Sequence, residues 1–348
     1  MSSLRFRHRL AALAVASVTA VSAALLPASP AAAAGTPLPA HVFAPYFETW
    51  TTDSITDLAQ QSGARYFTLA FLETTSKTSC TLAWNGDRSQ TLPTGRYLSD
   101  IASLRAIGGD VVPSFGGWSA DQAGTEIGDS CKDVNAIVAA YQSVITTYDV
   151  TRLDMDIEGR SLNRPDGIDR RNKAIKLLQD WAASTGRTVQ IVYTLPTTAT
   201  GLPASSLAVL QNAVANGVRI DFVNPMTFDY YDRVTTDMGA AAINAAQGLF
   251  NQLRTLYPAK TAAEIWAMEG NTIMPGIDDY PRRTEVTYPA DAQRLLDFAR
   301  ANGISILSMW AIQRDNGGCP GNGGSNDCSG IVQSTWEFTH ILAPFTGP

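Results

Sequence analysis

The heptad Leu153-Asp154-Met155-Asp156-Ile157-Glu158-Gly159 carries an acidic residue at every second position. In a β-strand, successive side chains point to opposite faces, so the three carboxylates would share one face and the three apolar side chains the other. Neighbouring acids would then lie about 6–7 Å apart along the strand. In a poorly solvated site they cannot all ionise freely at that spacing. At least one pKa should therefore rise toward the range that a general acid needs.

Two other interpretations of this heptad are open. An ordinary half-exposed strand also alternates apolar and polar residues, and a row of carboxylates can bind a divalent metal. Neither explains why Gly159 and a polar, proline-containing loop follow directly. Such a loop is typical of the catalytic end of a barrel strand.

The rest of the chain repeats one pattern, a short apolar run followed by a helical period. The eight strand-like runs are 42–47, 64–73, 110–117, 151–158, 188–195, 219–230, 263–269 and 304–310. Helical patterns cover 97–107, 134–148, 168–183, 207–215, 240–256, 290–301 and 335–341. Eight such units predict an α/β fold, a (β/α)8 TIM barrel, as one domain over residues 35–348. A doubly wound open sheet is the alternative, and the lack of a Gly-rich dinucleotide turn after the first strand counts against it.

The N-terminus has the character of a secretory signal. Arg5, Arg7 and Arg9 precede an uncharged run of apolar and small residues, and Ala32-Ala33-Ala34 forms a small-residue cleavage site. We expect residues 1–34 to be a signal peptide, which predicts a secreted, extracellular protein without a membrane anchor after cleavage. Its removal takes three of the 26 basic residues and leaves 32 acids, a net charge of −9. Such a surface is a poor match for nucleic acid, and we expect a monomer.

The number and spacing of the cysteines and histidines limit which disulfides and catalytic sites the protein can form. Cys319 and Cys328 bracket a Gly- and Asn-rich loop, so we expect them to pair, leaving Cys80 to pair with Cys131; four free buried thiols are the alternative. No C-x-x-C spacing suggests zinc. After signal cleavage only two histidines remain, which makes a Ser-His-Asp triad or a histidine-rich metal site improbable.

Acids and aromatic rings gather at the predicted carboxyl ends of the strands. In order, these ends carry Glu73, the segment 114–118, Asp154 with Asp156 and Glu158, Tyr193, the segment 226–230, Glu269 and Trp310. Barrel enzymes place their chemistry at this end. Carboxylates that break bonds beside flat rings that contact pyranose faces are typical of a sugar-binding cleft.

Four motifs in these strand ends resemble those of glycoside hydrolase family 18, the chitinase family, and the resemblance covers nearly all of residues 41–346. Ser114-Phe115-Gly116-Gly117 resembles the family's Ser-x-Gly-Gly signature, and 153–158 its Asp-x-x-Asp-x-Asp-x-Glu motif. Met226-Thr227-Phe228-Asp229 is similar to Met-x-Tyr-Asp, and Ser308-Met309-Trp310 to the eighth-strand tryptophan. The segment 273–279 also resembles a seventh-strand loop of single-domain bacterial chitinases.

The resemblance implies a substrate-assisted retaining mechanism that needs no cofactor and no metal. Glu158 would protonate the glycosidic oxygen, and the 2-acetamido carbonyl of the −1 sugar would attack its own anomeric carbon. Asp156 would hold the acetamido N–H, and Asp154 would share a proton with Asp156. The resemblance also implies that Asp229 and Trp310 hold the −1 sugar. With the residues at the other strand ends, the expected substrate-binding residues are Asp229, Trp310, Met226, Phe228, Tyr230, Tyr193, Ser114, Gly117 and Trp118.

The sequence departs from the family pattern at two places. Thr151 and Arg152 stand where the fourth-strand motif has its outermost aspartate and a glycine, and this position is remote from the reacting bond. Phe228 stands where the sixth strand has a tyrosine whose hydroxyl donates to the acetamido oxygen. A hydroxyl from Tyr230, Tyr231 or Tyr193 could replace that donor; otherwise the enzyme would be slow.

The expected partner is chitin or chitooligosaccharides. Only about 35 residues separate the predicted seventh and eighth strands, which leaves no room for the α+β insertion of some chitinases and favours an open groove and endo-cleavage. Two other functions remain open. One is an endo-β-N-acetylglucosaminidase acting on the chitobiose unit of N-glycans, and the other is a non-catalytic chitinase-like lectin.

Overall fold

The structure, a computed structural model, describes residues 37–323 and 325–347. The predicted signal peptide lies outside the described residues, and the domain boundary at residue 35 stays a prediction. The strands are β1 (Val42–Phe43), β2 (Tyr46–Glu48), β3 (Tyr66–Thr74), β4 (Leu82–Trp84), β5 (Asp110–Gly116), β6 (Arg152–Asp156), β7 (Gln190–Pro196), β8 (Phe222–Met226), β9 (Gly270–Ile273), β10 (Gly276–Ile277), β11 (Val286–Thr287) and β12 (Ile306–Met309). The α-helices are α1 (Ile55–Ser62), α2 (Leu98–Ala106), α3 (Gly117–Ala123), α4 (Ile127–Ser130), α5 (Val134–Tyr148), α6 (Pro165–Ser184), α7 (Ala204–Ala215), α8 (Met238–Leu256), α9 (Ala262–Trp266), α10 (Pro289–Asn302) and α11 (Glu337–Leu342).

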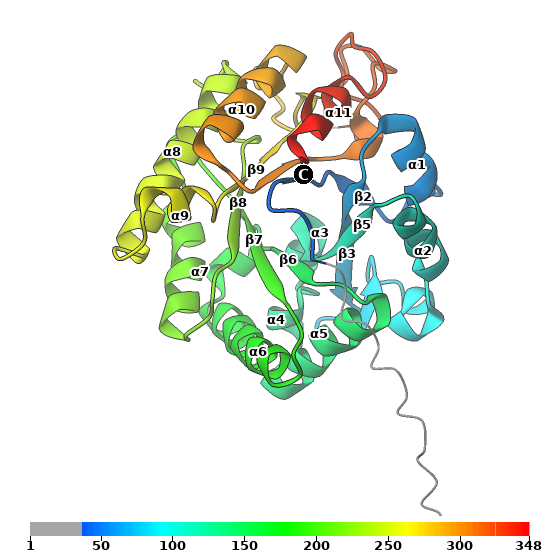
Figure 1. The fold of residues 1–348 in the computed structure, drawn as a ribbon, viewed down its shortest axis with the longest axis vertical. Helices are drawn as coiled ribbons and strands as arrows, with labels where there is room; N and C mark the ends of the chain where they lie inside the picture. Colours follow the sequence, from blue (N-terminus) through cyan, green and yellow to red (C-terminus); the bar gives the residue numbers. More distant parts are fainter. Residues whose placement is uncertain (1–36, 324, 348) are drawn as a thin grey trace, which may run out of the picture. The chain divides into compact units, whose positions relative to one another are not determined.

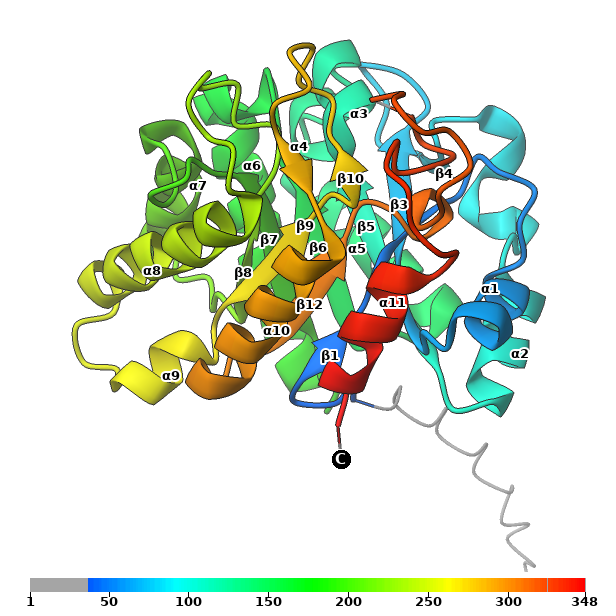
Figure 2. The same cartoon turned by 90° about the horizontal axis from the view of Figure 1, so that it is seen from above.

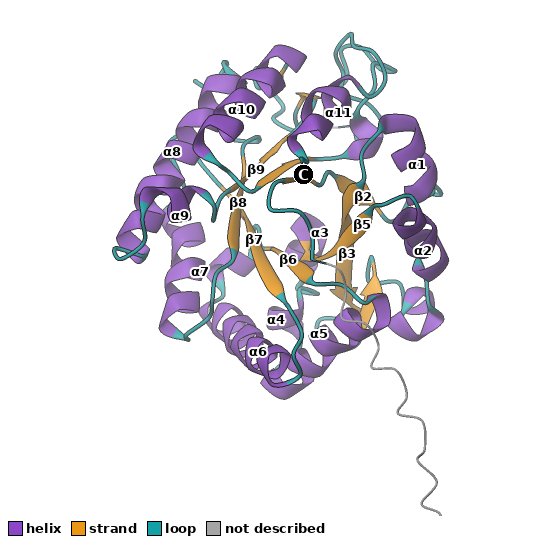
Figure 3. Cartoon of the chain, in the orientation of Figure 1, coloured by secondary structure: helices purple, strands orange, loops and turns teal. Residues whose placement is uncertain are grey.

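The sheet is a closed parallel barrel inside a ring of helices (Figures 1 and 3). The strand order is β1-β12-β9-β8-β7-β6-β5-β3-β2, and β1 and β2 are two pieces of one strand. Pro45 separates the pieces, and it has no N–H to donate to a neighbouring strand. Before it, Ala44 N–H donates to Leu307 O of β12, and Pro45 O itself accepts from Thr68 N–H of β3. The first strand thus bonds β12 and then β3, which confirms the predicted (β/α)8 barrel.

The fourth barrel strand has the two faces that its alternation predicts. Leu153, Met155 and Ile157 pack in the main hydrophobic cluster together with Tyr141 of α5 and Ile175 of α6. Asp154 and Asp156 point to the opposite side, the barrel interior. Strand β6 ends at Asp156, so Glu158 stands two residues past the strand and not at its last position, as the sequence suggested.

The predicted seventh strand, 263–269, was wrong. Residues Ala262–Trp266 form α9, and the seventh barrel strand is β9, which starts at Gly270. Thr261 and Glu264 form a capping box that starts the helix, a signal that outweighs the short apolar run. Glu269 therefore lies at the amino end of its strand, fully buried, and not at the rim with the other acids. Figure 2 shows α9 at one end of the barrel, with α3, α4 and β10 at the other.

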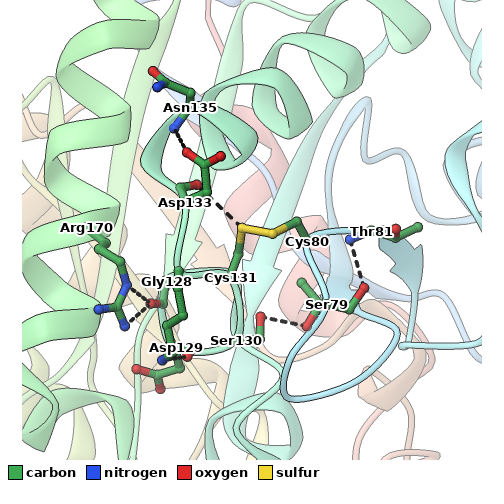
Figure 4. The surroundings of a disulfide bond; sticks show 12 residues. Ser79, Cys80, Thr81, Gly128, Asp129, Ser130, Cys131, Asp133, Asn135 and Arg170 are labelled. Atoms are coloured by element: carbon green, nitrogen blue, oxygen red, sulfur yellow. Dashed lines mark hydrogen bonds between the residues drawn. A yellow bond between two sulfur atoms is a disulfide. The ribbon is translucent and has the colours of Figure 1, made fainter.

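The loops at the carboxyl ends carry the remaining structure. A two-stranded antiparallel sheet, β10–β11, and α10 fill the connection between β9 and β12, which contains no larger α+β insertion. Both predicted disulfides are confirmed: Cys80 pairs with Cys131 and Cys319 with Cys328. The first joins the loop before β4 to the residue that follows α4 (Figure 4). Among the described residues, no helix has both the length and the apolar character needed to cross a membrane.

Candidate active site

Asp154 sits inside the barrel and is held by three hydroxyl groups. Its Oδ2 accepts from Tyr46 of β2 at 2.9 Å and from Ser114 of β5 at 2.6 Å, and its Oδ1 accepts from Thr194 of β7 at 2.7 Å. Burial raises the pKa of Asp154, and the three hydroxyl donors oppose that rise. Three strands therefore fix this carboxyl in place before any substrate arrives.

Asp156 lies one inward position nearer the rim and is 2% exposed. Its Oδ1 has no hydrogen-bond partner among the described residues. Burial raises the pKa of Asp156 well above its usual range, and the charges of Glu158, Asp154 and Asp121 add to the rise. The charge of Asp154 therefore disfavours ionisation of Asp156, so the two carboxyls titrate as a coupled pair. The open Oδ1 leaves Asp156 able to receive a donor from a ligand.

Glu158 stands at the open end of this row and is partly exposed. Burial raises its pKa to about 7; the backbone N–H of Trp118 opposes the rise, and the charge of Asp279 adds to it. A carboxyl that keeps its proton near neutral pH and reaches solvent is suited to act as a general acid. Its own backbone N–H donates to Asp121 Oδ2 of α3.

Two glycines let the end of β5 pass close to the acidic row. Gly116 has φ +100°, and a Cβ there would lie 2.1 Å from the backbone oxygen of Asp156. Gly117 has φ +82°, and its Cβ would lie 2.5 Å from the Phe71 ring. Only glycine fits such positions. The turn brings Trp118, 60% exposed, to the rim beside Glu158.

A group of aromatic rings lies beside the acids, and its member Tyr46 contacts Asp154. The Trp310 ring stacks on Phe71 with centroids 5.5 Å apart and planes at 7°. Tyr46 lies 5.5 Å from Trp310, and Trp50, 45% exposed, lies 6.0 Å from it. Stacked and partly exposed rings offer a flat apolar surface of the kind that binds sugar faces.

The loop after β8 is held by the carboxylates of the loop that contains β10 and β11. Asp229 N–H donates to Asp278 Oδ2 at 2.8 Å, and Asp229 Oδ1 accepts from Asp279 N–H at 2.9 Å. Burial, followed by the charges of Asp278 and Asp279, raises the pKa of Asp229 to about 8. Tyr230 N–H donates to Glu285. Asp229 can therefore present a protonated carboxyl, a donor, to a ligand at neutral pH.

The structure brings most of the predicted site residues together, but the positions of Tyr193, Ser114 and Gly117 differ from the prediction that their side chains bind substrate. Tyr193 is not at the rim: its neighbour Thr194 points inward, so Tyr193 points outward and donates to Asn172 of α6 at 2.8 Å. Ser114 is fully buried beneath Asp154 and holds that carboxyl. Gly117 shapes the backbone. Met226 ends β8 and is 8% exposed, and Phe228 is partly exposed.

Sequence reasoning missed several residues that build the site. Tyr46, Thr194, Phe71, Trp50 and Asp121 come from five different segments. The inward alternation of Tyr46 with Ala44 and Glu48 in the first strand could have indicated the first of them. Among the described residues, no group of three or more His, Cys, Asp or Glu is arranged to hold a metal ion.

A closed parallel barrel with a row of carboxyls and a group of aromatic rings at its carboxyl end is the architecture of a glycoside hydrolase. Residues 42–315 match the profile of the family described as glycosyl hydrolases family 18, and the chain belongs to that family. This confirms the resemblance drawn from the four motifs.

Named relatives and a solved structure agree. "Probable bifunctional chitinase/lysozyme" of Escherichia coli is 35% identical over 322 residues, 88% of this chain and 35% of that protein. "Endochitinase 11" of Metarhizium anisopliae is 36% identical over 289 residues, 80% of this chain and 53% of that protein. The chain thus spans about a third and about half of the length of these two relatives. The catalytic domain of a hyperthermophilic chitinase from Pyrococcus furiosus superposes with a TM-score of 0.78 at 32% identity, covering 90% of this chain and 97% of that one.

Proposed function

We propose that this chain is a chitinase that hydrolyses β-1,4-linked N-acetylglucosamine with retention of the anomeric configuration. The observation that carries the proposal is the row Asp154, Asp156 and Glu158 on one side of the fourth strand. Burial raises the pKa of each carboxyl, and that of Glu158 to about 7. Family membership and the names of the relatives supply the substrate class.

In the first step Glu158 gives its proton to the glycosidic oxygen as the bond from that oxygen to C1 breaks. The acetamido carbonyl oxygen of the same sugar bonds to C1, and the positive charge spreads over an oxazolinium ring. Asp156 accepts the acetamido N–H and stabilises that charge, while Asp154 keeps the shared proton. A water then attacks C1 and gives a proton to Glu158, which opens the ring and restores the acid.

The surroundings of the row suit an extended polysaccharide. Trp310 and Trp50 lie together as flat, partly exposed rings, and Trp118 is a third exposed ring at the rim. The β9–β12 connection adds only the small β10–β11 sheet and α10. We infer an open groove and cleavage within the chain rather than from one end.

The test uses Glu158→Gln together with a substrate panel. The amide keeps the side chain's shape but cannot protonate the leaving oxygen, so turnover of chitooligosaccharides should fall about 10²–10⁴-fold with binding retained. Glucosamine polymer and cellulose should not be cut, because they lack the acetamido nucleophile. Products should first appear as the β-anomer by proton NMR, and an initial α-product would exclude this mechanism.

Two further substrates decide between the competing functions. Release of glycans from a high-mannose glycoprotein, without cleavage of chitooligosaccharides, would replace the chitinase by an endo-β-N-acetylglucosaminidase. Binding of chitooligosaccharides without any product would leave a lectin.

We also propose that the protein is exported and acts as an extracellular monomer. The predicted signal at residues 1–34 supports export, and so do the two disulfides, since such bonds persist in oxidising compartments. Mass spectrometry and size-exclusion chromatography of the protein recovered from culture medium would test both statements.

A further inference from the structure

A second set of carboxyl groups lies directly behind the Glu158 backbone. Asp121 of α3 is fully buried, and its Oδ2 accepts the Glu158 N–H. Its Oδ1 lies 2.9 Å from Ser161 Oγ, in the short helical turn that follows. The same Ser161 Oγ lies 2.6 Å from Oδ2 of Asp129 in α4. The carboxyl groups of Asp121 and Asp129 therefore both contact the Ser161 hydroxyl group.

The number of protons at this contact limits how many of the two carboxyl groups can be ionised. A serine hydroxyl has one proton and can donate to only one of the two carboxyls. Were both ionised, the other contact would set two oxygen lone pairs against each other within hydrogen-bond distance, in a buried site. One of Asp121 and Asp129 must therefore carry a proton and donate it to Ser161.

The neighbouring charges show which carboxyl is protonated. Burial and the charge of Glu126 raise the pKa of Asp129, but two cations oppose that rise: Arg171, and Arg164, whose Nη1 lies 3.2 Å from Asp129 Oδ2. Asp121 faces only negative neighbours, Glu126 and Glu158, and has no ion pair among the described residues. The chain of donors then runs from Asp121 to Ser161 to Asp129.

We propose that Asp121 is a positioning residue for Glu158 that works as a neutral carboxylic acid, its carbonyl oxygen holding the Glu158 N–H and its hydroxyl donating to Ser161. The inference rests on the proposed function of Glu158. Neutral Asp121 fixes the backbone of the general acid Glu158 without placing a negative charge behind that residue. A carboxylate there would repel the charge that Glu158 acquires when it gives up its proton.

The protonation state of Asp121 determines how an amide should behave in its place. Asp121→Asn keeps one acceptor for the Glu158 N–H and one donor for Ser161, so kcat should fall at most a few-fold and the alkaline limb of the pH profile should stay in place. Asp121→Ala removes both contacts, and kcat should fall about 10- to 100-fold with KM little changed. Asp129→Asn is the matched reciprocal variant, and it should lower Tm because it removes the anion that Arg164 pairs with.

Opposite results would overturn the proposal. If Asp121→Asn lowers kcat tenfold and moves the alkaline limb to lower pH while Asp129→Asn is neutral, the proton sits on Asp129. Infrared difference spectra of wild type against Asp121→Asn give a readout that needs no turnover: a carboxylic acid C=O band must disappear in the variant. If the wild type cuts no chitooligosaccharide, the proposed function fails, and this band alone decides the state of Asp121.

Discussion

The alkaline limb of activity should report the ionisation of Glu158. Its pKa is raised to about 7, so it is roughly 90% protonated at pH 6 and roughly 10% protonated at pH 8. Because only the protonated form can act as the acid, kcat/KM on chitooligosaccharides should fall about tenfold between these two pH values. Initial rates measured from pH 5 to 9 would show the limb directly.

A charge variant tests whether the limb belongs to Glu158. Asp279 raises the pKa of Glu158, so Asp279→Asn should move the limb to lower pH. The shift should be below about one pH unit, because Asp279 is exposed and its charge is screened by solvent. Asp180→Asn removes the same charge near the C-terminal end of the outer helix α6, where Asp180 pairs with Lys176, and should leave the limb in place. A rate that stays flat to pH 9, or equal shifts in both variants, would refute the assignment.

Three other perturbations have defined outcomes. Burial raises the pKa of Glu48 to about 8, above its unfolded value near 4.3, so the stability that protonated Glu48 contributes is lost as pH rises through 8. Calorimetry from pH 5 to 9 should therefore show a smaller fall in Tm for Glu48→Gln than for the wild type. Phe228→Tyr should leave turnover unchanged or lower, since we expect Tyr230 or Tyr231 to supply the donor; a tenfold rise would show that the hydroxyl was missing. Reduction of Cys80–Cys131, which spans 51 residues, should cost about 2–4 kcal/mol of stability and lower Tm without abolishing the site; an unchanged Tm would contradict this.

The barrel could be predicted because its signal is repeated along the chain. Seven of the eight predicted strand regions overlap barrel strands, and the alternation in 153–157 correctly assigns each side chain to the interior or to the helix layer. The seventh failed because Ala262–Trp266 is as apolar and as short as a strand, and only the capping box at Thr261 shows the helix.

The site was less predictable than the barrel, because its supporting contacts join distant segments. Asp154 is held by residues 108 and 40 positions away, and no local pattern encodes such a meeting. Tyr193 was misplaced because a tyrosine at a strand end is equally compatible with either face until the register is known. Its neighbour Thr194, bonded to Asp154, settles the register.

The pairing of the first strand with β12, the last strand of the barrel, bears on how the chain acquires its fold. Residues of β12 bond to this strand across 264 positions, as in the contact of Ser308 Oγ with Ala44 O at 2.7 Å. A nascent chain that lacks β12 therefore exposes two unpaired parallel edges, at β1 and at β9, however much of the barrel has already formed. Closure of the barrel must wait until β12 (Ile306–Met309) is available, and the loop entropy of that last pairing slows folding. Until β12 pairs, the barrel stays open, and its exposed strand edges favour aggregation.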